Sequence, residues 1–344
     1  MDVQDEKLRA CLREEYGINT ATLEKVQGGL DSNAVVYRVI NERGESYLLK
    51  VRFSGPFYEP GCLIPHFLQE HGISSVVSPL TTKKETLWTE AGEWKVILYP
   101  FIKGDTRWTG MADNQWQELG EIFKQIHHVN PPPIKSLRRE NFNPAQYVQW
   151  VRDFAANLIH TQQNASESIQ KVCAAWNAHR SAIDAAVASL ETLGEVLQKR
   201  NLPQVLCHAD LHPANLLRED HSGRVFVIDW DEVMLAPKER DFIFIREPQA
   251  EAFFKGYGGK ANVDWMALSY YLWERVIQDV IAFTRDICFK LEWDEETRAD
   301  NFKLLDKLLT GCDGTIPAAR AAELRLQPDS NASNKKLRSE NPCR

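Results

Sequence analysis

The chain has 344 residues, of which 43% are hydrophobic and 26% are charged, as in an ordinary globular enzyme with one large domain or two smaller ones. Its 41 basic and 48 acidic residues give a net charge of −7, which argues against a nucleic-acid enzyme because such proteins usually present a basic face. The acidic balance would suit a cationic small-molecule substrate, although it also serves general solubility.

The expected location is the cytoplasm. The sequence begins with the acidic, polar run 1–7, which is unlike a signal peptide, and it contains no apolar run long enough to span a membrane. The seven cysteines include no Cys-x-x-Cys pair, which favours free thiols in a reducing compartment over a disulfide or zinc framework.

The first predicted elements are a helix and a glycine-containing turn. Leu8, Leu12 and Tyr16 are spaced four residues apart, which predicts a helix over 3–16. The turn at 27–33 then precedes an apolar strand over 34–39. Backbone N–H groups of such a turn can bind phosphate oxygens, but a simple β-turn explains the pattern as well.

The next predicted strand, 46–52, contains Lys50 among apolar residues. Burying an ammonium group without a partner is costly, and kinases place a phosphate-binding lysine on a strand of this kind. An edge-strand lysine facing water is the alternative. Arg52 faces the same side two residues later, so the choice between the two cations stays open.

A phosphate-binding lysine of this type is expected to pair with a glutamate on the following helix. Glu59 is the first candidate and Glu70 the second, although either is equally explained as a solvated surface residue. Pro60 and Pro65 predict that this helix is irregular.

Strands, a lobe boundary and then helices are predicted along the rest of the first two hundred residues. The break at 103–105 marks the boundary after an N-terminal lobe of residues 1–102. Asp113 is a candidate N-cap for a helix with one apolar stripe. The predicted strands are 74–78, 85–88 and 94–101, and the predicted helices are 114–127, 147–159 and 169–198.

The most informative stretch is 205–232. Asp210 is followed five residues later by Asn215, and Asp229 ends a short apolar run after a polar, glycine-containing turn at 219–223. The turn predicts a hairpin that folds Asp229 back towards the loop that contains the other two residues. Phosphoryl transfer needs a carboxylate to orient the attacking hydroxyl and oxygen ligands for Mg²⁺, and kinases use this order of Asp, Asn and Asp.

Two other interpretations of this stretch are open. Taken singly, these residues could make only turn and cap hydrogen bonds. A metal hydrolase is also conceivable, because His208, Asp210 and His212 alternate and could share one face of a strand. Pro213 interrupts any such strand, however, and no further His/Cys cluster follows to complete a zinc site.

The motifs resemble those of a known superfamily. His208 to Asn215, followed by Val-Ile-Asp-Trp-Asp at 227–231, is similar to the aminoglycoside phosphotransferase and choline kinase-like superfamily. Protein kinases differ, since they have Arg in place of Ala209 and Asp-Phe-Gly at the metal-binding strand. The longer strings 27–34, 99–102, 229–241 and 269–271 look most like the spectinomycin phosphotransferase branch, and the resemblance runs from about residue 10 to about residue 320.

The resemblance implies an α+β, bilobal protein-kinase-like fold, with a small antiparallel-sheet N-lobe and a larger helical C-lobe over 103–326. The polar segment 327–344 is predicted to be a disordered tail. In this family Asp210 would be the catalytic base, while Asn215 and Asp229 would bind Mg²⁺. Residues implied to bind ATP are Lys50 with its partner Glu59, Ser32 and Asn33 over the phosphates, and Tyr99, Phe101 and Ile102 near the purine.

Acidic and aromatic residues supply candidates for binding the acceptor. Asp231, Glu232, Tyr270 and Glu274 could form an acidic rim for an amine-bearing molecule, although surface charge alone explains each of them equally well. Asp241 resembles the family's aspartate that braces the catalytic loop, and a helix N-cap is the alternative.

The predicted function is ATP- and Mg²⁺-dependent phosphorylation of a hydroxyl on an aminocyclitol or aminoglycoside antibiotic, with spectinomycin preferred by resemblance and resistance as the outcome. Nucleic-acid and membrane partners are not expected. The alternatives are a metabolic kinase of the same fold, acting on choline, methylthioribose or homoserine, and a nucleotide-binding protein without catalysis. The complete set of Asp210, Asn215 and Asp229 argues against the last, because a protein that only binds needs no base.

Overall fold

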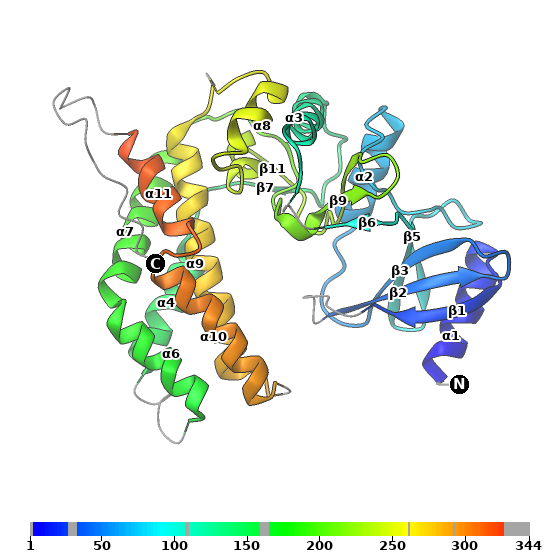
Figure 1. Cartoon of the computed structure of the whole chain (residues 1–344), viewed down its shortest axis with the longest axis horizontal. Coiled ribbons are helices and arrows are strands. Elements are labelled where there is room, and N and C mark those ends of the chain that lie inside the picture. Colours follow the sequence, from blue (N-terminus) through cyan, green and yellow to red (C-terminus); the bar gives the residue numbers. More distant parts are fainter. Residues whose placement is uncertain are drawn as a thin grey trace. The chain divides into compact units, whose positions relative to one another are not determined.

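The computed structural model describes residues 3–26, 33–106, 110–158, 165–260, 262–291 and 293–326. The chain divides into two compact units (Figure 1). Unit 1 comprises Met1–Arg139 and Val205–Lys260, and unit 2 comprises Glu140–Gln204 and Ala261–Arg344. Among the described helices, none combines the length and the apolar character that crossing a lipid bilayer requires.

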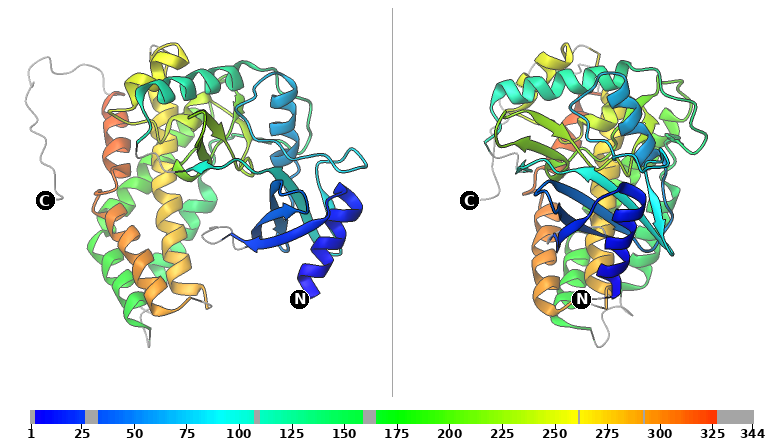
Figure 2. Two further views of the ribbon diagram at one scale, coloured as in Figure 1. Left: turned by 45° about the vertical axis from the view of Figure 1, so that its right-hand side comes forward. Right: turned by 90° about the vertical axis from the view of Figure 1, so that its right-hand side faces the viewer.

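Unit 1 begins with a five-stranded antiparallel sheet in the order β1-β2-β3-β5-β4 (Figures 1 and 2). The alternation of side chains along a strand gives its two faces different roles. Leu49 and Val51 of β3 pack into the core with α1, whereas Lys50 and Arg52 lie on the opposite face. The elements of this part are α1 (Val3–Cys11), η1 (Leu12–Tyr16), β1 (Thr20–Lys25), β2 (Ala34–Asn41), β3 (Ser46–Arg52), β4 (Thr89–Ala91) and β5 (Trp94–Pro100).

Helix α2 (Pro60–Glu70) lies on the face of the sheet that bears Lys50. Its Cys62 packs against Ile97 of β5 and against Leu87, with aromatic residues around them. Pro60 occupies the first helical turn, where its missing N–H costs nothing, and Pro65 lies inside the helix. The predicted helix is therefore present, and it is a continuous α-helix despite its two prolines.

Two small sheets follow in unit 1. Strands β9 (Leu216–Glu219) and β10 (Val225–Val227) form the predicted antiparallel hairpin, extended by β6 (Gly104–Asp105). The second sheet has the order β7-β11-β8, from β7 (Arg138–Arg139), β11 (Met234–Ala236) and β8 (Val205–Cys207). Short 3₁₀ turns η2 (Pro213–Asn215) and η3 (Lys238–Phe242) lie in the same region.

Helices α3 (Asp113–His128) and α8 (Ala250–Tyr257) cross closely in unit 1. The predicted apolar stripe of α3 is buried, including Trp116 and Phe123. Gly120 and Gly256 allow the crossing, because a Cβ on either would overlap a backbone carbonyl oxygen of the other helix. Asp113 is the first residue of α3 and Ala112 its N-cap, so the N-cap assignment of Asp113 was wrong by one residue.

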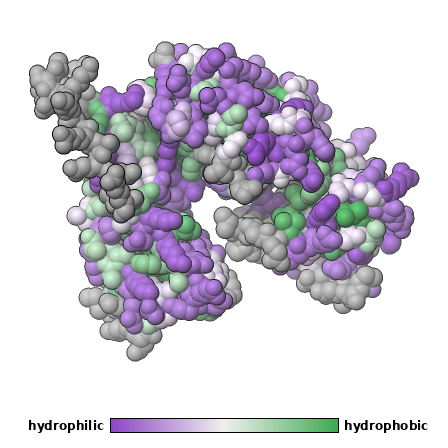
Figure 3. Space-filling view, viewed as in Figure 1, coloured by the Kyte–Doolittle hydropathy of each residue, from purple (hydrophilic) through white to green (hydrophobic). Residues whose placement is uncertain are grey.

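Unit 2 is helical. The long helix α9 contacts each of the other described helices of the unit. A few large apolar side chains remain exposed, among them Phe289, Leu291 and Leu324, and mostly hydrophilic side chains occupy the face in Figure 3. The helices are α4 (Ala145–Ala156), α6 (Glu167–Ala178), α7 (Arg180–Leu197), α9 (Trp265–Phe289), α10 (Glu295–Leu309) and α11 (Thr315–Leu324).

The mixed α+β class is as predicted, but several details differ. The strand expected at 85–88 is wrong: β4 forms at Thr89–Ala91. The segment 74–78 contributes only an isolated bridge, between Val76 and Val227. The helix predicted over 169–198 is two helices, separated at His179.

The compact units do not follow the predicted division at residues 102 and 103, because the first sheet and the hairpin belong to the same unit. A lobe boundary there stays a prediction, and the predicted tail 327–344 lies outside the described residues. Cys312 is disulfide-bonded, so the expectation of free thiols is wrong at that position, whereas the other described cysteines are free.

The close crossing of α3 and α8 leads to a prediction about stability. We expect Gly256→Ala to lower the free energy of unfolding by about 1–3 kcal/mol, because the added methyl group forces the two helices apart. Urea unfolding monitored by circular dichroism measures the change. Glu121→Ala, on the exposed side of α3, should change it by less than about 0.5 kcal/mol. Equal stabilities of both variants would show that the crossing tolerates a methyl group.

Candidate active site

A buried carboxylate fixes the backbone just before Asp210. The side chain of Asp241 accepts hydrogen bonds from the backbone N–H of His208 at 3.0 Å and of Ala209 at 2.8 Å. Its Oδ2 also lies 3.0 Å from Nε2 of His127. Asp241 thereby braces the loop that holds Asp210, as the resemblance implied.

The backbone on both sides of the site adopts an unusual conformation. Ala209 has φ = 68° and Asp229 has φ = 60°, in the left-handed region that residues other than glycine rarely occupy. Such strain persists only where surrounding contacts hold it, and it is concentrated at functional sites. At Ala209, the hydrogen bond from its backbone N–H to the side chain of Asp241 is such a contact.

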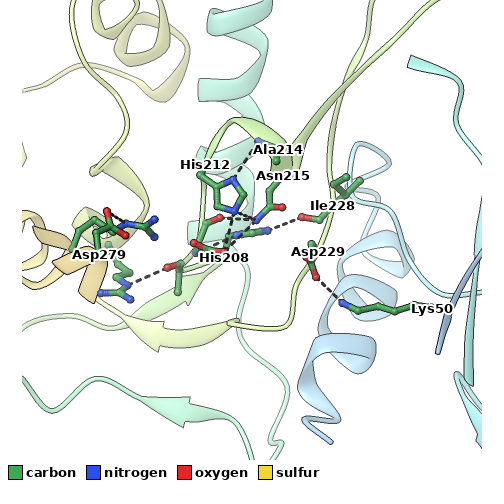
Figure 4. Close-up of polar contacts among 12 residues, drawn as sticks. Lys50, His208, His212, Ala214, Asn215, Ile228, Asp229 and Asp279 are labelled. Carbon is green, nitrogen blue, oxygen red and sulfur yellow. Dashed lines mark hydrogen bonds and ion pairs between the residues drawn. The ribbon is translucent and has the colours of Figure 1, made fainter. Parts of the chain in front are cut away.

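Asp210 and Asn215 lie together in the loop between β8 and β9. Nδ2 of Asn215 donates to the backbone oxygen of Asp210 at 2.8 Å and lies 3.4 Å from its Oδ2. His212 lies beside both, with Nε2 at 3.2 Å from Nδ2 of Asn215 and 3.3 Å from Oδ2 of Asp210 (Figure 4). Among the described residues, the hydrogen bonds of the Asn215 side chain all use Nδ2, which leaves its Oδ1 as the oxygen available to a cation.

The hairpin brings Asp229 back to this loop. The backbone N–H of Ile228 donates to the carbonyl oxygen of Asn215 at 3.0 Å, and Nε2 of His208 lies 2.9 Å from the carbonyl oxygen of Ile228 (Figure 4). These two contacts place the strand before Asp229 next to the loop of Asp210. The structure thus unites the three motif residues within unit 1.

Lys50 reaches the same region from β3. Its Nζ lies 2.9 Å from Oδ1 of Asp229 and 2.8 Å from Oδ2 of Asp231. Burial disfavours the charged ammonium, but the two carboxylates outweigh burial and raise the pKa of Lys50 above its ordinary value. Because the pKa is raised, the stabilisation from these ion pairs is fully present below the ordinary lysine pKa and is lost only at more alkaline pH.

The partner predicted for Lys50 is not the one observed. Glu59 is exposed, and no side-chain partner for it is found among the described residues. Glu70, the second candidate, is also exposed and pairs with His66. The predicted pairing of Lys50 with Glu59 or Glu70 is therefore not observed. The carboxylates that contact Lys50 are those of Asp229 and Asp231.

A buried group of possible metal ligands is fully used by hydrogen bonds. His127, Cys207 and Asp241 place one potential ligand atom each within 4.8 Å of one another. The other ring nitrogen of His127 lies 2.9 Å from the Tyr257 hydroxyl, and the Cys207 thiol lies 3.5 Å from the carbonyl oxygen of Ala236. Burial raises the pKa of Cys207 well above its usual value, which favours the neutral thiol as a hydrogen-bond donor. We interpret the cluster as structural.

The residues predicted to bind the nucleotide are distributed over the first sheet. Ser32 lies outside the described residues. Oδ1 of Asn33 accepts a hydrogen bond from the hydroxyl of Ser54, which follows β3. Tyr99 lies at the end of β5, and Phe101 and Ile102 follow it, with both partly exposed. Contact of these residues with a nucleotide stays a prediction.

The four predicted acceptor residues are divided between the units. In unit 1, Asp231 is engaged by Lys50, and Glu232 is exposed and lies 2.7 Å from NH1 of Arg138. In unit 2, Tyr270 is fully buried and Glu274 is 6% exposed. The structure does not place Tyr270 and Glu274 on an exposed rim, because this face of α9 packs into the protein. Acceptor contact by any of the four stays a prediction.

A family comparison agrees with this geometry. The profile of the phosphotransferase enzyme family, APH, matches residues 22–269, which include every motif residue described above. The chain belongs to this family. No curated protein sequence matches the chain significantly.

Solved structures with this fold confirm the kinase-like architecture. The structure of spectinomycin phosphotransferase, APH(9)-Ia, in complex with ADP and spectinomycin has 30% sequence identity to this chain and a TM-score of 0.83. The match covers 92% of this chain and 98% of that one. The amicoumacin kinase hAmiN, in complex with AMP-PNP and Ca²⁺, has 16% identity and a TM-score of 0.60, over 92% and 95%. A microcompartment-associated aminopropanol kinase has 13% identity and a TM-score of 0.62, over 92% and 98%, so the last two show the fold alone.

Two features of the site were not identified from the sequence. The first is the pairing of Arg52 with Asp231, in which NH1 lies 2.8 Å from Oδ2, whereas the sequence indicates Arg52 only as an alternative to Lys50. The spacing of Lys50 and Arg52 on one strand face was the available signal. The second feature is His127, whose contact with Asp241 helps to brace the loop that holds Asp210.

The bracing contacts can be tested by stability. We expect Asp241→Asn to lower the free energy of unfolding by about 1–3 kcal/mol, because the new NH₂ group faces buried donors and leaves at least one unsatisfied. Urea unfolding provides the measurement. Asp220→Asn, at an exposed carboxylate in the β9–β10 turn, serves as the control and should stay within about 0.5 kcal/mol. If both variants unfold alike, Asp241 does not hold the loop in place.

Proposed function

We propose that the protein transfers the γ-phosphoryl group of ATP to a hydroxyl group of an aminocyclitol or aminoglycoside antibiotic, with spectinomycin as the preferred acceptor. The observation that carries this proposal is the union of Asp210, Asn215 and Asp229 in one site of unit 1. Family membership supports phosphotransfer, and the 30% identity to a phosphotransferase solved with ADP and spectinomycin supports the acceptor.

Asp210 is assigned as the catalytic base. Its carboxylate remains partly exposed, so an acceptor hydroxyl can approach it. Asp210 accepts the hydroxyl proton as the acceptor oxygen forms a bond to the γ-phosphorus. The bond from the γ-phosphorus to the bridging oxygen breaks at the same time, and ADP leaves with that oxygen.

Asn215 and Asp229 are assigned as the ligands of Mg²⁺. An amide oxygen and a carboxylate are the hard oxygen donors that this cation prefers, and the side chain of Asp229 is about half exposed, so the donor set fits the ion. When bound, Mg²⁺ would neutralise negative charge on the phosphate oxygens. Asn215 keeps its Oδ1 oriented because its Nδ2 is held by the backbone of Asp210.

Lys50 is assigned to the nucleotide phosphates. It lies on the same sheet face as Arg52, beside the metal-binding aspartate, and its pKa is raised, so its ammonium stays charged at neutral pH. A charged ammonium at this place offsets the negative charge of a polyphosphate.

Among the predicted acceptor residues, Glu232 is the exposed carboxylate of unit 1 and the one best placed to meet an amine from solution.

The acceptor assignment is tested by ADP release from Mg·ATP in the presence of spectinomycin, kanamycin, hygromycin, streptomycin, choline or methylthioribose. We expect saturable release with spectinomycin and no response to kanamycin. Turnover with choline or methylthioribose alone would retain the catalytic assignments and overturn the antibiotic acceptor. Tight ATP binding with no turnover in the whole panel would favour a nucleotide-binding protein without catalysis.

The base assignment is tested by Asp210→Asn. We expect kcat to fall by about 10²–10⁴-fold while the affinity for ATP is retained, because the base acts on the acceptor hydroxyl and not on the nucleotide. Single-turnover kinetics and calorimetric titration with ATP separate the two quantities. Asp220→Asn should retain the activity of the unmodified protein, and an active Asp210→Asn variant would remove Asp210 from the mechanism.

A further inference from the structure

We propose that Asp231 positions Lys50 and Arg52 as a pair of phosphate-binding cations, so that Arg52 is a second ligand of the nucleotide phosphates. In this arrangement the carboxylate that orients the lysine comes from the loop after β10 and not from helix α2. This inference rests on the proposed ATP binding, and it assigns to Asp231 a role different from acceptor recognition.

The first step is the geometry of β3. Residues two apart on a strand point to the same face, so Lys50 and Arg52 both project from the sheet towards the loop after β10. One oxygen of Asp231, Oδ2, lies 2.8 Å from Nζ of Lys50 and 2.8 Å from NH1 of Arg52. A single carboxylate thereby sets the positions of both cations.

The second step is what α2 presents to this cluster. From Pro60 the helix has no acidic residue until Glu70, which lies in its last turn. The residue that faces Asp231 is Gly61, where a Cβ would lie 3.2 Å from Oδ1 and 3.3 Å from Cα of Asp231. The absence of a side chain at Gly61 lets the loop approach the helix, which leaves room for the carboxylate of Asp231 beside it.

The third step concerns charge. Asp229 also contacts Lys50, but Asp229 is the proposed metal ligand, so Asp231 is the carboxylate that remains to hold Lys50 when Asp229 binds a cation. The side chains of Lys50 and Arg52 are only 12% and 16% exposed. Burial of the two cations is costly without a partner, so a carboxylate is needed beside them. Arginine suits this place because its planar donors match phosphate oxygens.

The experiment measures binding of ATP, ADP and adenosine by calorimetric titration, with Mg²⁺ and with EDTA. For Asp231→Asn and Arg52→Gln we expect the affinities for ATP and ADP to fall by about tenfold or more under both conditions, because charge-assisted contacts are lost. The affinity for adenosine, which has no phosphate, should be unchanged. Asp231→Glu keeps the carboxylate and should recover part of the lost affinity.

Two control variants alter the same residue types outside the cluster. Asp220→Asn changes an exposed carboxylate of the β9–β10 turn, and Arg43→Gln changes an exposed guanidinium of the β2–β3 turn. Both should bind ATP, ADP and adenosine like the unmodified protein. A parallel loss of adenosine binding in the cluster variants would indicate general damage to unit 1 and overturn the proposal.

Other outcomes reassign Asp231. Loss of ATP binding that appears only with Mg²⁺ in Asp231→Asn, and is absent in Arg52→Gln, would make Asp231 a metal ligand. A raised KM for the acceptor with unchanged nucleotide affinity would return Asp231 to acceptor recognition. If the unmodified protein does not bind ATP, the proposed function itself fails. If the unmodified protein and the two variants all bind ATP equally well, only the present inference is overturned.

Discussion

The hydrogen bonds of the buried Asp241 carboxylate are the interaction on which the active site depends. They hold the backbone N–H groups of His208 and Ala209, and they stabilise a left-handed conformation at Ala209 that alanine disfavours. This conformation directs Asp210 away from the strand that precedes it. The strained turn that precedes Asp210 is therefore held by a carboxylate more than thirty positions along the chain.

A second constraint is the close packing of α2 against the loop after β10. The glycine at position 61 permits this approach, and it removes the option of a carboxylate on that part of the helix. The cations of β3 are consequently balanced by Asp229 and Asp231, which follow the hairpin. The first sheet, helix α2 and the loop after the β9–β10 hairpin are thus joined by ion pairs as well as by apolar packing.

Local features of the fold were predictable from the sequence, whereas long-range pairing was not. The β9–β10 hairpin, the strand of Lys50 and the apolar stripe of α3 follow from turn residues and periodicity. The order of Asp210, Asn215 and Asp229 predicted the core of the site. The partner of Lys50 was mistaken because its carboxylates are about 180 residues away, and sequence spacing contains no information about contacts at that distance. The burial of Tyr270 was missed for a similar reason, since the pattern of α9 is apolar on most sides.

The path of the chain between the two units has a consequence for folding during synthesis. The chain leaves unit 1 after β7 and returns at β8, and both of these strands pair with β11. Helices α4, α6 and α7 leave the ribosome before α9, the helix that they pack against, is made. Since domains generally form as units in order of synthesis, unit 1 can close around its hairpin while the apolar faces of these three helices still wait for their partner. During that interval the nascent chain exposes the apolar faces of three helices and depends on protection from aggregation.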